Sequence, residues 1–205
     1  MTAAEPNSPE WVAELEGSAP DVVAIWRLID PDDFSRDYSA TRDELTRRAG
    51  PGSAAGVLAQ QEAIADALEA ILAEMPEELL QAPGGEGDWN VAQAFAHATG
   101  SRRYLAAAAA MAARGEWPDP PPVVTPGIPG PADADRQVLL TLLGKSRRSM
   151  ALSAAAIAGH ETDPCPLDHP LIGARLLCGE WLLFCGVHDL MHLEQLHNLL
   201  DRAPE

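Results

Sequence analysis

The stretch EWLLFCGVHDLMHLEQLHNLL, residues 180–200, decides the fold class expected of this chain. It contains no proline, and its apolar residues recur at intervals of three and four, which is typical of an α-helix. One stripe of that helix carries Trp181, Cys185, His188, His192, Gln195 and Leu199, flanked by Phe184, Met191 and Leu196. His188 and His192 therefore lie on the most apolar face, whereas His197 points to the opposite side and is expected to be solvated.

The same spacing predicts three earlier helices, over about residues 53–74, 88–114 and 132–158, and extends the last one to about 174–201. Asp88 is a good N-cap for the second helix. Alanine and leucine supply most of the 46% hydrophobic content, which also favours helices over strands. These observations predict an all-α protein built on a four-helix bundle.

The remaining segments connect or precede these helices. Residues 115–131 and 159–173 are rich in proline and are expected to be loops. Residues 1–50 form an acidic N-terminal extension ahead of a bundle over residues 51–205. Within the extension, SPEWVAELEG and APDVVAIWRLID predict two short helices, whereas DPDDFSRDYSATRDELTRRAGPG is polar and is expected to be irregular.

The last helix is apolar on more than the histidine face. Four leucines lie away from it: Leu182, Leu183, Leu190 and Leu193. Exposed together, they would form too large an apolar patch for a soluble monomer. We expect the patch to be covered either by the extension, through Trp11, Val22, Val23 and Trp26, or by a second subunit in a homodimer.

Charge and composition restrict the partners of the chain. A formal net charge of -17 argues against binding to nucleic acid and to anionic membranes, and it favours solubility. Three cysteines without paired spacing argue against a disulfide framework. No signal peptide and no membrane-spanning run is expected, so the pattern predicts a cytoplasmic protein that acts on a small-molecule substrate.

Histidine spacing is the feature that carries chemistry. His188 and His192 are four residues apart, so a helix places both imidazoles on one face, about one turn apart. In the second helix, DWNVAQAFAHATGSRRYL places His97 on a stripe of small and apolar residues. Packed together, the two helices could form a three-histidine divalent metal site with an open coordination position, which is the pattern of catalytic zinc sites. The alternative is three buried histidines that bind nothing and are satisfied by hydrogen bonds.

Three neighbours of this site have two interpretations each. Cys185 could be a fourth ligand or a redox partner, but a small core residue is the preferred interpretation. Gln195 could orient a bound water or ligand, or cap a buried polar atom elsewhere. Tyr104 could act as an acid or hydrogen-bond donor near the metal, or be a core tyrosine. We take Tyr104 and Gln195 as candidate cofactor-binding residues.

Other polar residues have weaker claims. Arg102 or Arg103 could bind an anionic substrate at the mouth of the site, but adjacent residues on a helix diverge by about 100°, so at most one could point there. His160, Cys165 and His169 match no defensible ligand spacing, and we expect them to belong to a loop that positions the last helix.

The stretch DWNVAQAFAHATGSRRYL, followed much later by HPLIGARLLCGEWLLFCGVHDLMHLEQL, resembles the DinB-like family. That family includes bacillithiol and mycothiol S-transferases and a mycothiol-dependent maleylpyruvate isomerase. The resemblance covers about residues 54–201, and it implies a four-helix bundle with a divalent metal, often zinc or nickel, held by three histidines. These fall on His97, His188 and His192, the residues that the helical stripes select independently.

The resemblance implies a metal-dependent enzyme that activates a low-molecular-weight thiol such as mycothiol, of the S-transferase or isomerase type. Two alternatives stay open: a non-catalytic bundle that binds a metal or ligand, and a hydrolase that uses metal-activated water. In each case the histidines are expected to be ligands rather than bases.

Overall fold

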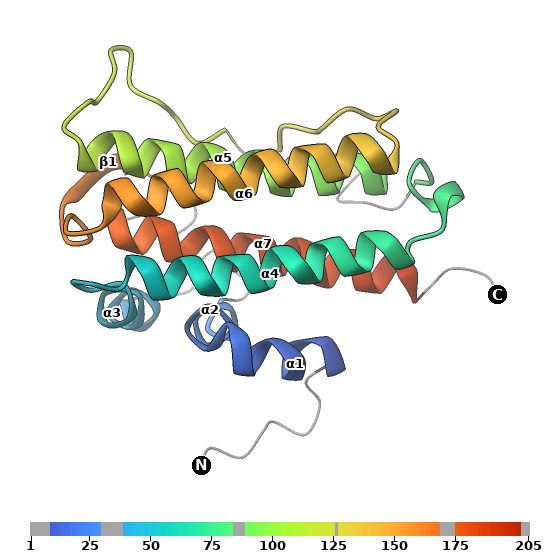
Figure 1. Ribbon diagram of the computed structural model, residues 1–205, viewed down its shortest axis with the longest axis horizontal. Coiled ribbons are helices and arrows are strands. Elements are labelled where there is room, and N and C mark those ends of the chain that lie inside the picture. The colour runs from blue at the N-terminus through green and yellow to red at the C-terminus, as the bar shows by residue number, and fades with distance from the viewer. Residues whose placement is uncertain (1–8, 30–38, 84–88, 126, 169–174, 202–205) are drawn as a thin grey trace.

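The computed structural model describes residues 9–29, 39–83, 89–125, 127–168 and 175–201. Its long helices are α4 (Ala54–Glu74), α5 (Val91–Ala113), α6 (Arg136–Ile157) and α7 (Cys178–Leu200). They form a four-helix bundle (Figure 1), which confirms the predicted all-α fold. Their bounds agree with the sequence pattern to within a few residues.

The four helices form two layers, with α5 and α6 in one and α4 and α7 in the other (Figure 1). α5 packs against α6 and α7, and α4 packs against the same two helices. α5 and α6 run in the same direction, opposite to α4 and α7 (Figure 1), so the chain between them travels back along the bundle. That crossover, residues 114–135, contains the predicted proline-rich loop.

Side chains cap the start of α5 and the end of α4, where backbone groups lack partners within the helix. Asn90 caps α5: its side chain accepts a hydrogen bond from the N–H of Gln93, and the Gln93 side chain accepts one from the N–H of Asn90. Asp88, the expected cap, lies outside the described residues, and the helix begins later than predicted. Arg136 donates to the carbonyl oxygens of Leu72 and Met75, and so caps the C-terminus of α4 from the start of α6. A short 3₁₀ helix, η1 (Glu77–Leu79), follows α4.

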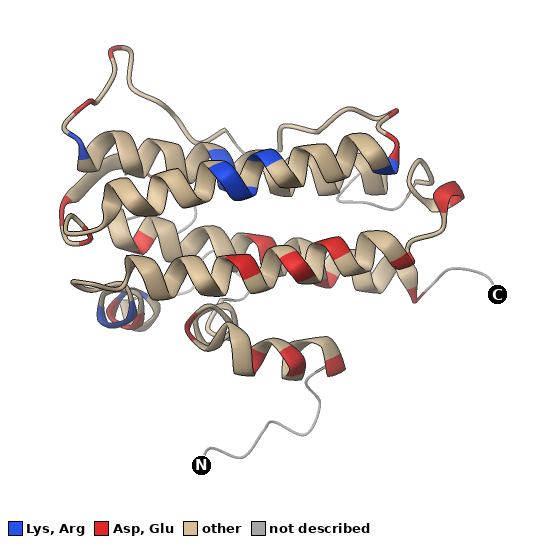
Figure 2. Cartoon of the chain, in the orientation of Figure 1, with Lys and Arg blue, Asp and Glu red and all other residues tan. Residues whose placement is uncertain are grey.

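Charged side chains join α4 and α6 at the surface. Acidic residues lie along α4, and basic residues lie near the middle of α6 (Figure 2). Arg147 lies 2.8 Å from carboxylate oxygens of Glu62 and Asp66 and 3.0 Å from Glu69. Pairs this exposed contribute at most about 1 kcal/mol each, so apolar packing, not charge, holds the two helices together.

The segment between α6 and α7 contains a small antiparallel sheet where the sequence predicted only a loop. Strand β1 (Pro164–Asp168) pairs with β2 (Arg175–Leu177), and Pro164 lies opposite Leu177. Cys165 and Leu167 alternate with exposed residues and face the core. The sequence pattern missed this strand because proline normally indicates a loop. On the open edge of a two-stranded sheet, however, proline is tolerated.

Three helices precede the bundle: α1 (Glu10–Ser18), α2 (Pro20–Trp26) and α3 (Ser39–Arg48). The first two match the predicted short helices. α3 contradicts the expectation of an irregular segment: within the helix only Thr41 and Leu45 are buried, so its apolar periodicity was too sparse to detect.

α2 packs against α7 and covers the leucine patch. Leu182, Leu183, Leu190 and Leu193 are all 0% exposed. Val22 reaches the helix surface at Gly186, where an added Cβ would lie 2.9 Å from its Cγ1 atom. The four leucines are therefore buried within one chain, and α2 of the extension packs on the helix that carries them, whereas the possible homodimer stays a prediction. The division of the chain at about residue 50 stays a prediction.

His197 is half-buried, which corrects the expectation that it is solvated. The ring of Trp11 stacks on it, with centroids 5.1 Å apart and an angle of 7° between the planes. The sequence placed His197 on the side of α7 away from the histidine stripe, but Trp11 of α1 lies against the ring there.

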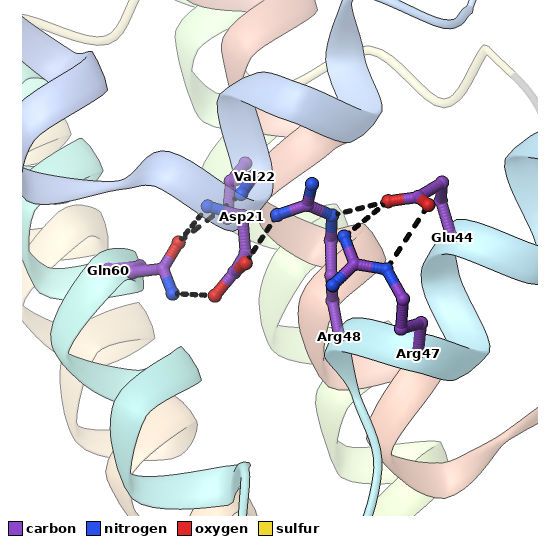
Figure 3. A network of polar contacts seen from close by, with 6 residues as sticks. All are labelled: Asp21, Val22, Glu44, Arg47, Arg48 and Gln60. Atoms are coloured by element: carbon purple, nitrogen blue, oxygen red, sulfur yellow. Dashed lines mark hydrogen bonds and ion pairs between the residues drawn. The ribbon is translucent and has the colours of Figure 1, made fainter. Parts of the chain in front are cut away.

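A polar network attaches α2 and α3 to the bundle (Figure 3). The Gln60 side chain on α4 accepts hydrogen bonds from the N–H groups of Asp21 and Val22, at 2.8 and 3.2 Å, and so satisfies two first-turn amides of α2. Arg48 on α3 lies 2.6 Å from Asp21 and 3.0 Å from Glu44. The extension is thus tied to the bundle by directional contacts as well as by apolar packing.

No helix in the described part of the chain combines the length and apolar character needed to cross a bilayer.

We predict that Val22→Asp detaches α2 from α7. The substitution places an unpaired carboxylate against apolar side chains, so the free energy of unfolding should fall by about 3–5 kcal/mol. Binding of a hydrophobic dye at neutral pH should rise as the leucines become exposed. Ala13→Asp adds the same charge at an exposed position of α1 and should change stability by less than about 0.5 kcal/mol. Equal effects of the two variants would show that α2 is not a necessary cover.

We predict that His197 makes the protein less stable in acid. Burial lowers the pKa of His197, although Asp201, Glu74 and Glu14 oppose the shift. The unfolded chain therefore binds a proton more readily, and the stability from the neutral ring is present above about pH 6.5 and is lost as the pH falls toward the lower folded pKa. His197→Gln should reduce the loss of unfolding free energy between about pH 7.5 and pH 5, measured by urea titration.

The control for this measurement is His160→Gln, which replaces an exposed histidine in the segment after α6. If His197→Gln and the wild-type chain lose the same free energy over this pH range, the stacked histidine does not contribute to acid sensitivity.

Candidate metal centre

His97, His188 and His192 lie together between α5 and α7. Their potential ligand atoms all fall within 4.8 Å of one another. The ring centroids are 5.3 Å apart for His97 and His188, 5.1 Å for His97 and His192, and 4.6 Å for His188 and His192. We refer to these three residues as the histidine cluster.

Helix geometry explains the arrangement. His188 and His192 follow each other by one turn on α7, so their rings lie on one face. α5 runs antiparallel to α7 (Figure 1). α5 begins directly after the Asn90 cap, about two turns before His97. The start of the helix therefore sets the level along α7 at which the His97 ring lies.

Acceptor oxygens hold the Nδ1 atoms of His97 and His192. The Nδ1–H of His97 donates to the carbonyl oxygen of Ile128 at 2.8 Å, and that of His192 donates to Oε1 of Gln195 at 3.1 Å. These bonds select the tautomer in which Nε2 carries no proton, which is the state that binds a metal. Ser101 Oγ lies 3.4 Å from the Nε2 of His97, a weak contact that a metal would replace.

The donor set fits a divalent transition metal. Three neutral imidazoles suit zinc, nickel or copper, and nitrogens around tetrahedral zinc lie about 3.4 Å apart for bonds of about 2.0–2.1 Å. Small ring adjustments would bring the histidine cluster to that spacing. His192 is 6% exposed, whereas His97 and His188 are half-buried, so the cluster lies near the surface. Among the described residues, no fourth His, Cys, Asp or Glu joins the group, so a tetrahedral ion held by these three residues would keep one position for another ligand.

The crossover loop reaches His97 because Gly130 lies directly on α5. Its N–H donates to the carbonyl oxygen of Gln93 at 3.3 Å. A Cβ on Gly130 would come within 2.3 Å of the Cβ of Ala96, so a larger residue would lift the loop. Sequence reasoning predicted the loop, but it missed the carbonyl of Ile128, because a backbone acceptor leaves no signal in the residue type.

Trp89 forms an aromatic side of the cluster that sequence reasoning did not assign to the site. Its ring centroid lies 5.0 Å from that of His97, at an angle of 60°, and the residue is half-buried. Its position directly before the Asn90 cap of the helix that carries His97 is the signal that could have identified it.

The two candidate cofactor-binding residues have different environments. Gln195 orients His192, as described above. Tyr104 is 43% exposed, so it is not a core tyrosine, and its hydroxyl donates to the carbonyl oxygen of Val123 at 2.9 Å. Tyr104 therefore fastens the crossover loop to α5, and a role for either residue in binding a cofactor stays a prediction.

Cys185 and Arg102 belong to the core. Cys185 is 0% exposed, its thiol donates to the carbonyl oxygen of Arg102 at 3.7 Å, and burial raises the pKa of that thiol. Arg102 is 0% exposed beside Asp189, so it cannot meet a substrate at the mouth of the site; Arg103 is exposed. Burial raises the pKa of the Asp189 carboxyl to about 7, against the opposing effect of the Arg102 charge.

The second histidine and cysteine group does not form a site in the described residues. His160 is exposed and lies 2.8 Å from Asp163. Cys165 is buried on β1 beside the thiol of Cys178. His169 lies outside the described residues.

The fold and the histidine cluster together define a helical bundle with a candidate metal centre between adjacent helices. The family model of the DinB superfamily matches residues 60–196, which is most of the chain, and the protein belongs to that superfamily. No curated protein and no solved structure matches the chain.

Proposed function

We propose that this protein is a metal-dependent enzyme that binds one divalent ion through His97, His188 and His192 and activates a low-molecular-weight thiol, in an S-transferase or isomerase reaction. The observation that carries the proposal is the convergence of three imidazoles from two helices, with the Nδ1 atoms of His97 and His192 bonded to acceptor oxygens. The DinB-like resemblance supports zinc or nickel as the ion and mycothiol as one candidate thiol.

Each part of the site has a distinct task in this proposal. The histidines are ligands, and the Ile128 carbonyl and the Gln195 amide keep two of them in the ligating tautomer. When bound, the metal supplies a Lewis acid that lowers the pKa of a thiol or water in the open position. Trp89 and the crossover loop form an apolar side that limits water and receives the substrate.

The open coordination position favours an enzyme over a structural metal site. Structural zinc sites are closed by four protein ligands, and the described residues supply only three. The same position could hold water for a hydrolase, so the response to thiols is the property that separates the two reactions. A non-catalytic bundle would bind the metal but would show neither thiol activation nor hydrolysis.

We predict that the purified protein contains about one equivalent of a divalent metal. Elemental analysis of protein prepared without added metal or chelator measures this. His97→Ala, His188→Ala and His192→Ala combined should remove the metal, because no comparable donor group remains among the described residues. A control with His160→Ala and His197→Ala loses the same residue type elsewhere and should keep its metal. Unchanged metal in the triple variant would contradict the ligand assignment.

We predict that thiols bind directly to the metal. With Co²⁺ in the site, mycothiol or a related small thiol should produce a sulfur-to-metal charge-transfer band, and its affinity should rise with pH until the thiol is ionised. His192→Ala should abolish the band. Its helical circular dichroism should largely survive, because the packing of the bundle outweighs one lost ligand.

A matched control for the thiol experiment is the corresponding alcohol, which has the same shape without sulfur and should leave the near-ultraviolet spectrum unchanged. If none of the thiols tested changes the Co²⁺ spectrum, the transferase and isomerase proposal fails and a hydrolase or binding role is favoured.

A further inference from the structure

Arg102 and Asp189 form an ion pair in the core, between the two helices that carry the histidine cluster. Nε of Arg102 on α5 lies 3.0 Å from Oδ2 of Asp189 on α7, and both side chains are 0% exposed. Asp189 directly follows His188, and Arg102 lies five residues after His97. The contact therefore joins α5 to α7 within two turns of all three candidate ligands.

Further hydrogen bonds extend this contact to a third helix. Nη2 of Arg102 donates to the backbone oxygen of Gln61 on α4 at 3.1 Å and to its side-chain oxygen at 3.3 Å. Nε2 of Gln61 donates to the carbonyl oxygen of Leu182 at 2.8 Å. The network thus closes a ring from α5 to α4 to α7 and back to α5.

Stability of the fold does not account for this pair. Two charges taken from water into a protein interior lose hydration that their attraction repays only when every polar atom is satisfied. Here Nε and Nη1 of Arg102 and both carboxylate oxygens of Asp189 make no hydrogen bond among the described residues, so opposite charge alone joins the two side chains across 3.0 Å. Apolar residues of similar size at both positions would keep the packing without that cost. A buried contact between opposite charges on two facing helices, however, favours one register of those helices, which apolar contacts do only loosely.

The candidate metal centre requires a fixed axial register of α5 against α7. Metal ligands must lie within about 0.2 Å of their preferred distances, whereas one residue of sliding along a helix moves a side chain by about 1.5 Å. His188 and His192 share one helix and keep their spacing whatever α7 does. His97 reaches them from the other helix, so its distance depends on how α5 sits against α7.

We propose that Arg102 and Asp189 are positioning residues that set the register of α5 against α7 and thereby hold His97 at ligand distance from His188 and His192. This inference rests on the proposed metal binding. Neither residue touches the metal or the substrate, and Gln61 supports the pair by orienting the guanidinium group.

The test is the double variant Arg102→Met and Asp189→Leu, which removes both charges together and leaves no unpaired ion. The metal-free variant should keep its helical circular dichroism and its midpoint of urea unfolding. Its affinity for Co²⁺, measured by titration against a chelating indicator, should fall by about 10–100-fold, as found for groups that orient metal ligands. The visible Co²⁺ spectrum should also change, because the coordination geometry is altered.

The matched control is Arg48→Met and Asp21→Leu, which removes an ion pair between α2 and α3 whose other polar partners are Glu44 on α3 and Gln60 on α4. This variant should bind Co²⁺ with wild-type affinity and spectrum. If the wild-type chain itself binds no Co²⁺, the proposed function fails. If it binds and the Arg102 and Asp189 variant matches it in affinity and spectrum, the positioning role is overturned. Failure of the metal-free variant to fold would equally overturn it, because the pair would then serve the fold as a whole.

Discussion

α7 is apolar around most of its circumference, and a helix of this kind must be covered on every side. α4 and α5 cover two sides, and α2 and α3 cover the side that a simple four-helix bundle would leave open. Glu180 shows how closely this cover is joined: its carboxylate accepts hydrogen bonds from Thr46 on α3 and from the N–H of Leu177 at the start of α7. The extension is thus part of the same core, and α7 is held where its two histidines can meet His97.

The histidine cluster combines two levels of control. Helix positions bring the three rings together, whereas contacts from a loop and a side chain choose which nitrogen His97 and His192 present. The Ile128 carbonyl acts on His97 and the Gln195 amide acts on His192. A site built this way depends on the crossover loop as much as on the bundle, and Gly130 allows the loop to lie on α5.

Sequence patterns located the long helices because their apolar residues recur over more than five turns, and they selected His97, His188 and His192 because these share apolar faces. The patterns failed where a short or polar element depends on its partners: α3 has few apolar residues, and β1 carries prolines that its open edge tolerates. Arg102 could not be assigned, since only the packed helices place Asp189 beside it. The same limit applied to His197, whose ring partner lies more than 180 residues earlier in the chain.

The order of the helices has a consequence for folding during synthesis. α7 follows α2 to α6, which pack on it, so these helices leave the ribosome before that partner exists. Until then the parts of α2, α4 and α5 that α7 will cover, Val22 included, lack their partner, and contacts so distant in sequence form slowly. Before α7 is synthesised, the incomplete chain therefore exposes apolar helix faces. Its surplus of acidic residues keeps such intermediates apart by mutual repulsion.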